Sequence, residues 1–223
     1  MNDKFPRIFH APNSPGLTRG DKRIGSLEQF KGKDILITEK LDGSNVCLTS
    51  REVFARSHAK LPTHISFDML KAVHARVRSE IPNDVSIFGE WLFAKHSILY
   101  ETLPNYLMIF AVRVDFKSGM VWASWDETKK IAFDLGLEVV PTLIHPYAPL
   151  AITSASHLEA LMSTKAKGPS AYGKEKEGCV ARIPGVIPDK LFSSLVVKYV
   201  RAHHVKTDEH WSHAKLIKNK LAK

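Results

Sequence analysis

The stretch from Tyr106 to Phe116 limits the possible folds of this sequence more than any other feature. It reads YLMIFAVRVDF, so apolar residues occupy both its odd and its even positions over most of its length. Successive side chains of a strand point to opposite faces, and a strand here would be apolar on both faces. Such a strand is stable only when other layers cover it. The sequence therefore predicts a central strand inside a layered domain.

Strand-like and helix-like segments flank this stretch in irregular order. Short apolar runs predict strands over 35–37, 46–48, 53–55, 85–93, 137–143, 179–183 and 195–200. Helical spacing predicts helices over 67–81, over 126–135, and from Ser154 or Ser156 to about Lys165. Because strands and helices do not alternate regularly, the pattern is typical of a single α+β domain rather than a parallel βαβ sheet.

The charge balance favours an anionic partner. The 223 residues include 32 Lys and Arg against 23 Asp and Glu, a formal net charge of +9. Such an excess is typical of proteins that bind nucleic acid or nucleotides, with an inert basic surface as the alternative. No stretch reaches the roughly 18 apolar residues of a membrane span, and the N-terminus lacks a signal peptide's apolar run. We expect a cytoplasmic protein without a membrane partner, whose Cys47 and Cys179 are buried free thiols.

Lys40 stands between a predicted strand and an Asp42-Gly43 turn, within the run EKLDGSN over residues 39–45. A lysine can act as a nucleophile only when it is neutral, which requires a pKa depressed by burial or by nearby cations. Arg56 and Lys198 are candidate cations for this purpose. The alternative is a surface lysine beside a hairpin, because Asp-Gly is a common hairpin dipeptide.

This run resembles motif I of the covalent nucleotidyltransferases, which include polynucleotide ligases and capping enzymes. Its Ser44-Asn45 ending is the variant of the nick-sealing RNA ligases. Five later segments resemble the following motifs in the family's order: FARS at 54–57, IFGEW at 87–91, YLMIF at 106–110, EGCVAR at 177–182 and VVKY at 196–199. On these six segments, the chain resembles the ATP-dependent RNA ligases of the nick-sealing type.

The resemblance implies a single nucleotidyltransferase domain of the ATP-grasp-like ligase adenylation type, with central antiparallel sheets flanked by helices. It implies ATP as the AMP donor, Mg²⁺ or Mn²⁺ as the metal, and Lys40 as the catalytic nucleophile that carries AMP. The residues that it implies for binding ATP or AMP are Glu39, Leu41, Asn45, Arg56, Glu90, Phe110 and Lys198. Glu177 would hold the metal, and Glu175 could assist it.

The residue patterns allow plainer alternatives for several of these positions. Glu90 interrupts an apolar strand, and a buried carboxylate needs a partner, either a ribose or a core arginine. Phe110 fits ordinary core packing, and Glu177 fits a solvated acid in a run of charges. Lys198 lies in the apolar run LVVKYV, where an unpaired lysine is rare.

The sequence departs from the family in motif V, which often carries two lysines spaced i and i+2. Here Lys198 has Val196 and Val200 at those positions. Arg182 or Arg201 could replace the missing lysine.

The implied activity is sealing of RNA, with transfer of AMP to a 5′-phosphate end and joining to a 3′-hydroxyl. An ATP-dependent DNA ligase, a capping guanylyltransferase and a non-catalytic nucleic-acid-binding module are the alternatives. The histidine-rich run 203–213 suggests a basic surface near RNA, with a zinc site as the weaker interpretation.

We expect an N-terminal arm over 1–26, an adenylyltransferase domain over 27–206 and a short basic helix over 207–223. Basic residues of the arm could contact phosphates. Many relatives add a C-terminal domain, so a partner protein could supply that part.

Overall fold

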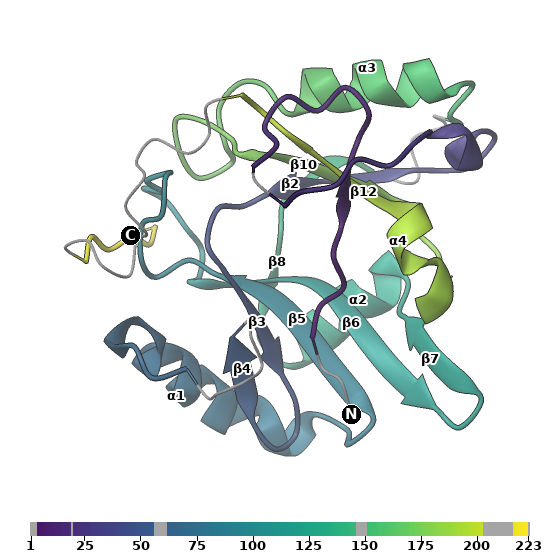
Figure 1. Cartoon of the computed structure of the whole chain (residues 1–223). Coiled ribbons are helices and arrows are strands. Elements are labelled where there is room, and N and C mark those ends of the chain that lie inside the picture. The colour runs from purple at the N-terminus through teal and green to yellow at the C-terminus, as the bar shows by residue number, and fades with distance from the viewer. Residues whose placement is uncertain (1–3, 19, 56–61, 146–150, 203–215, 223) are drawn as a thin grey trace.

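The computed structural model describes residues 4–18, 20–55, 62–145, 151–202 and 216–222. Within them the chain forms two mostly antiparallel sheets, one above the other in Figure 1. The first sheet consists, in spatial order, of β1 (Phe9–His10), β12 (Val196–Val200), β10 (Gly178–Arg182), β2 (Leu36–Lys40) and β9 (Thr142–Ile144). The second consists of β11 (Ile187–Pro188), β7 (Gly119–Trp122), β6 (Leu107–Phe116), β5 (Val85–Trp91), β3 (Ser44–Leu48) and β4 (Val53–Ala55), with β8 (Glu138–Val139) beside β6.

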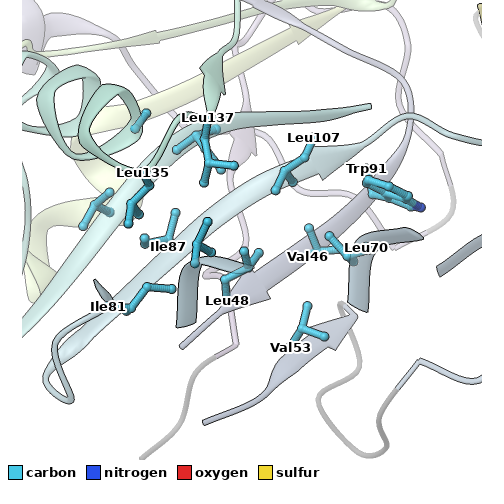
Figure 2. Packing of buried hydrophobic residues seen from close by; sticks show 14 of the residues in the cluster. Val46, Leu48, Val53, Leu70, Ile81, Ile87, Trp91, Leu107, Leu135 and Leu137 are labelled. Carbon is cyan, nitrogen blue, oxygen red and sulfur yellow. The ribbon is translucent and has the colours of Figure 1, made fainter. Parts of the chain in front are cut away.

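The predicted central strand is confirmed as β6, which lies between β5 and β7. Its two apolar faces enter different parts of the core. Leu107 and Ile109 join the cluster between the second sheet and the helices α1 (Asp68–Val77) and α2 (Trp125–Asp134), which Figure 2 shows. Met108 and Ala111 face the space between the two sheets.

The helices predicted over 67–81, over 126–135 and from Ser154 or Ser156 to about Lys165 form where the sequence places them. Ser124 caps α2 through a capping box with Glu127, which satisfies the free backbone N–H groups of the first turn. Ser154, rather than Ser156, caps α3 (Ala155–Lys165). Figure 1 shows α3 over the first sheet, where it packs on β10. Short helical turns complete the set: η1 (Glu28–Phe30), η2 (Ile65–Phe67), η3 (Arg78–Glu80), η4 (Asp189–Leu191) and α4 (Phe192–Leu195).

Strands β2 and β3 belong to different sheets, so the turn at Asp42-Gly43 is a crossing between sheets and the hairpin alternative is wrong. A Cβ atom at Gly43 would lie 2.6 Å from the carbonyl oxygen of Trp91. Only glycine allows the chain to pass this close to β5. The crossing carries the chain from one sheet to the other immediately after Lys40.

Both ends of the described chain differ from the expected arm and helix. The arm supplies β1, which pairs in parallel with β12 and extends the first sheet. At the other end, residues 216–222 run alongside residues 93–103 through isolated bridges, so the predicted helix is wrong over this part. The remainder of that predicted helix, and the histidine-rich run 203–213, lie outside the described residues. No helix within the described ranges is long and apolar enough to cross a bilayer.

Candidate active site

A cavity of about 620 Å³ opens between the two sheets, beside the crossing that follows Lys40. Residues of both sheets and of the N-terminal arm line it. It brings together nearly all the residues that the sequence predicts for the site: Glu39, Lys40, Leu41, Asn45, Glu90, Phe110, Glu177 and Lys198. Arg56 lies outside the described residues. The motifs, spread over more than a hundred residues of sequence, therefore converge on one space.

Lys40 is the last residue of β2, paired in register with Gly178 of β10. Its Nζ lies 2.6 Å from Oε2 of Glu177, and its side chain is 26% exposed. Burial lowers the pKa of Lys40, but the nearby carboxylates of Glu177, Glu90 and Asp42 outweigh burial and raise it above its usual value. The expected depression of this pKa is therefore wrong for the site as described, where Lys40 is an ammonium ion paired with Glu177.

Three carboxyl groups surround the single amine of Lys40, those of Glu177, Glu90 and Asp42. Burial raises the pKa of Glu90 to about 8 and that of Glu177 to about 7, and each carboxylate also feels Asp42. Glu90 accepts a hydrogen bond from the N–H of Gly43 at 3.1 Å, which ties β5 to the crossing. Burial and mutual repulsion thus disfavour negative charge on these carboxyl groups, and a bound cation would offset both effects.

A hard divalent cation fits this donor set, because Mg²⁺ and Mn²⁺ prefer oxygen ligands. Among the described residues, no group of three or more His, Cys, Asp or Glu side chains forms a complete metal cage. Mg²⁺ is commonly held by one or two carboxylates, waters and the phosphates of a substrate. Glu177 at the cavity wall suits that arrangement. Glu175, its expected assistant, instead pairs with Arg201 at 2.7 Å.

Asn45 and Glu90 are directly opposite each other on β3 and β5, so they share the face that looks into the cavity. Oδ1 of Asn45 is buried and has no hydrogen-bond partner among the described residues. Buried polar atoms are normally paired, so this atom is suited to a ligand.

Glu39 also lines the cavity, but its side chain lies on the opposite face of β2 from that of Lys40. Its carboxylate accepts a hydrogen bond from the N–H of Ala171 at 3.1 Å. Strand alternation puts this side chain on the face of Ile37, which packs with α3. Leu41 is buried in the core between the sheets, with an edge at the cavity.

Phe110 lies at the apolar end of the cavity and is partly exposed there. The ring of Phe5, from the N-terminal arm, packs edge-on against it with centroids 5.1 Å apart. Phe5 also contacts Phe88, Trp122 and Phe192. The arm thus forms part of the apolar wall of the cavity, which its many Pro and Gly residues do not predict.

Lys198 reaches the cavity from β12, and its Nζ lies 3.1 Å from Oδ1 of Asp21. Burial lowers the pKa of Lys198. The other oxygen of Asp21 lies 3.2 Å from Nε2 of His10 and accepts hydrogen bonds from Thr18. Basic residues of the arm are the predicted phosphate contacts. The contact of Asp21 is not predicted, because nothing in a single sequence indicates that this acid meets β12.

Of the two arginines that could replace the missing lysine of motif V, Arg182 is the one that lines the cavity. It lies directly opposite Val196 in the β10–β12 register and lines the cavity. Its Nη2 is buried without a hydrogen-bond partner among the described residues, while its guanidinium covers the ring of Trp125. Arg201 is instead held by Glu175.

The comparisons with known proteins agree with this geometry. The family model described as RNA ligase matches residues 33–200. A structure of a Naegleria gruberi RNA ligase with PPi is 17% identical, with a TM-score of 0.54, and the match covers 89% of this chain and 57% of that one. A mutant of that ligase with ATP and Mn gives 16% identity, a TM-score of 0.53, and 89% and 58% coverage. An archaeal ATP-dependent RNA ligase gives 16% identity, a TM-score of 0.53, and 89% and 48% coverage.

These likenesses concern the fold, and the expected nucleotidyltransferase-type α+β fold is confirmed. The chain spans little more than half the length of the Naegleria structures that it matches. No curated protein sequence matches it significantly. Because the family model covers most of the sequence, the chain belongs to the RNA ligase family.

Proposed function

We propose that the chain is an ATP-dependent RNA ligase that forms a lysyl-AMP intermediate on Lys40. The observation that carries the proposal is the position of Lys40, at the wall of the cavity and 2.6 Å from Glu177. Glu90, Asn45 and Lys198 line the same cavity. A lysine in this setting has a nearby carboxylate and cationic groups for a phosphate, and its nitrogen becomes nucleophilic once it loses its proton.

In the first step, Nζ of Lys40 forms a bond to the α-phosphorus of ATP while the bond to pyrophosphate breaks. The ammonium form must first lose a proton to solvent, which ends its ion pair with Glu177 and frees the electron pair of Nζ for the attack. Lys198 would neutralise charge that develops on the α-phosphate. A divalent cation held by Glu177 would supply further neutralisation when bound. Glu90 and Asn45 would bind the nucleotide from the second sheet.

In the later steps, AMP passes to the 5′-phosphate of an RNA strand, and a 3′-hydroxyl then displaces AMP as the strand is sealed. The formal charge of +9 favours binding of the RNA backbone. We also propose that a partner protein adds RNA-binding surface.

Two experiments with purified protein test the function. Incubation with Mg²⁺ and either α-labelled ATP or α-labelled GTP should label the protein with ATP only, whereas labelling with GTP would indicate a capping-type activity.

Nicked duplexes with RNA or DNA on the 3′-hydroxyl side should then be sealed only with RNA. Equal sealing of an all-DNA nick would support a DNA ligase instead. Label uptake without sealing would place the sealing step with a partner protein.

Replacement of Phe110 with alanine should weaken ATP binding. Base stacking on an aromatic ring contributes about 1–3 kcal/mol, so we expect KM for ATP to rise by about 10-fold or more. Phe116 is an exposed phenylalanine at the end of the same strand, and Phe116→Ala is the matched control. Equal KM values for the two variants would contradict a stacking role.

Replacement of Arg182 should also weaken ATP binding, because its buried Nη2 would lose the acceptor that a bound nucleotide offers. Hydrogen bonds to charged groups contribute about 1.5–3 kcal/mol, so KM for ATP should rise by about 10- to 100-fold in Arg182→Ala. Arg182→Lys should recover part of this loss. Lys190→Ala removes one exposed positive charge and should leave KM unchanged. A similar KM in all three variants would show that Arg182 serves packing on Trp125 alone.

A further inference from the structure

The segment 216–222 lies beyond the part of the chain that matches the family model, yet it is built into the neighbourhood of Lys40. Its backbone exchanges hydrogen bonds with the loop 93–103 at five places. Among them are Lys95 N to Ile217 O at 2.8 Å and Lys220 N to Tyr100 O at 2.9 Å. Figure 1 shows the end of the chain against this loop. The loop is thus held by the far end of the sequence.

Asn219 is the centre of this contact. It is only 2% exposed, which is rare for an asparagine outside a binding site. Its Nδ2 donates to the carbonyl oxygen of Leu92 at 2.7 Å, and its Oδ1 accepts from the N–H of Tyr100 at 2.9 Å. The hydroxyl of Tyr106 donates to its backbone oxygen at 3.1 Å. One side chain therefore joins both ends of the loop.

Tyr100 links Asn219 to the Asp42-Gly43 crossing. Its ring is fully buried, and its hydroxyl oxygen accepts a hydrogen bond from the N–H of Asp42 at 2.8 Å. One carboxylate oxygen of Asp42 in turn accepts from the N–H groups of Ser97 and Ile98, at 2.7 and 2.9 Å. The crossing two residues after Lys40 is therefore fixed by three hydrogen bonds from the loop that Asn219 holds.

We propose that Asn219 is a positioning residue for the nucleophile, acting through Tyr100 on the Asp42-Gly43 crossing. This inference rests on the proposed function of Lys40. In-line attack requires the nitrogen to be placed to within a fraction of an ångström, and the crossing sets the end of β2 from which Lys40 projects. The base and the ribose would contact other strands, so Asn219 affects the rate of attack and not the binding of ATP.

The test is single-turnover formation of lysyl-AMP, in which the amplitude counts competent molecules and the rate constant reports their geometry. Asn219→Ala should lower the rate constant by about 10- to 100-fold, with KM for ATP within about twofold of the wild-type value. Tyr100→Phe removes only the hydroxyl and should slow attack to a similar extent. The double variant should be no slower than the slower single variant, because the two residues act in one chain of contacts.

Lys220→Ala is the matched control, since its exposed side chain lies in the same segment and its backbone contacts remain. It should react at the wild-type rate. If Asn219→Ala lowers only the amplitude, or if Tyr100→Phe reacts at the wild-type rate, Asn219 has a structural role alone and the proposal is wrong. If Asn219→Ala does not fold, the rate constant of Tyr100→Phe still tests the proposal.

Hydrogen exchange separates this proposal from the proposed function. The amide of Asp42 should exchange faster in Asn219→Ala and in Tyr100→Phe than in Lys220→Ala, whether or not the protein takes up AMP. If the wild-type protein takes up no AMP but the variants show this exchange pattern, the proposed function of Lys40 is refuted. The contacts from Asn219 through Tyr100 to Asp42 would still stand. Unchanged exchange in both variants would refute the path itself.

Discussion

Replacement of Lys40 with alanine is expected to abolish covalent uptake of AMP, the largest single effect in this molecule. The reason is chemical, because no other lysine of the described ranges combines the end of β2, the cavity and the contact with Glu177. Lys40→Arg should be equally inactive, since a guanidinium keeps the positive charge beside Glu177 but is not a nucleophile at working pH. The measurement is transfer of α-labelled AMP to protein, resolved by denaturing electrophoresis.

The control for this loss is Lys33→Ala, which removes an exposed lysine just before the same strand. It should label as the wild type does. Labelling of Lys40→Ala at the wild-type level would show that the nucleophile lies elsewhere.

Replacement of Glu177 with glutamine is expected to slow AMP uptake by about 100-fold, the order of loss that follows removal of one stabilising group from a charged transition state. Two effects combine. The site loses the carboxylate best placed to hold a divalent cation, and Lys40 loses its ion-pair partner at 2.6 Å. Single-turnover rates measured over a series of Mg²⁺ or Mn²⁺ concentrations should show a weaker metal dependence in the variant.

The matched control for this variant is Glu175→Gln. Glu175 precedes Glu177 by two residues but pairs with Arg201 away from the cavity. We expect its replacement to change the rate by less than about threefold, as for most partly exposed ion pairs. The same rate and the same metal dependence in Glu175→Gln and Glu177→Gln would refute a metal-binding role for Glu177.

Local patterns were enough to predict much of the fold. The two-sided apolar run over 106–116 predicts a central strand because burial on both faces is a property of the strand itself. Likewise, Ser124 and Ser154 mark the starts of α2 and α3, since a cap depends on residues only a few positions away. The motif residues that line the cavity could also be predicted, because each motif is a short run of sequence.

Long-range pairing could not be predicted in the same way. The pairing of β1 with β12 and the contact of Asp21 with Lys198 join residues more than 170 positions apart. A single sequence contains no signal for the register of such pairs. The contacts of Asn219 could not be predicted for the same reason, and the sequence predicts a helix where residues 216–222 lie extended beside the loop 93–103.

The pKa of Lys40 could not be predicted from the sequence, because it depends on how many charges of each sign the fold brings together. The sequence suggested cations near Lys40, from Arg56 and Lys198. The structure places Glu177, Glu90 and Asp42 around it, and their combined effect raises its pKa despite burial. Lys40 could lose its proton more easily only if bound ligands changed this balance of charges.

The most direct test of the central claim is to locate the AMP. Wild-type protein incubated with ATP and Mg²⁺, then digested and analysed by mass spectrometry, should contain one peptide whose mass is increased by one adenylyl group. Fragmentation should place that group on Lys40, through an acid-labile phosphoramidate bond. Attachment to any other residue, or no modified peptide from a protein that binds ATP, would contradict the account.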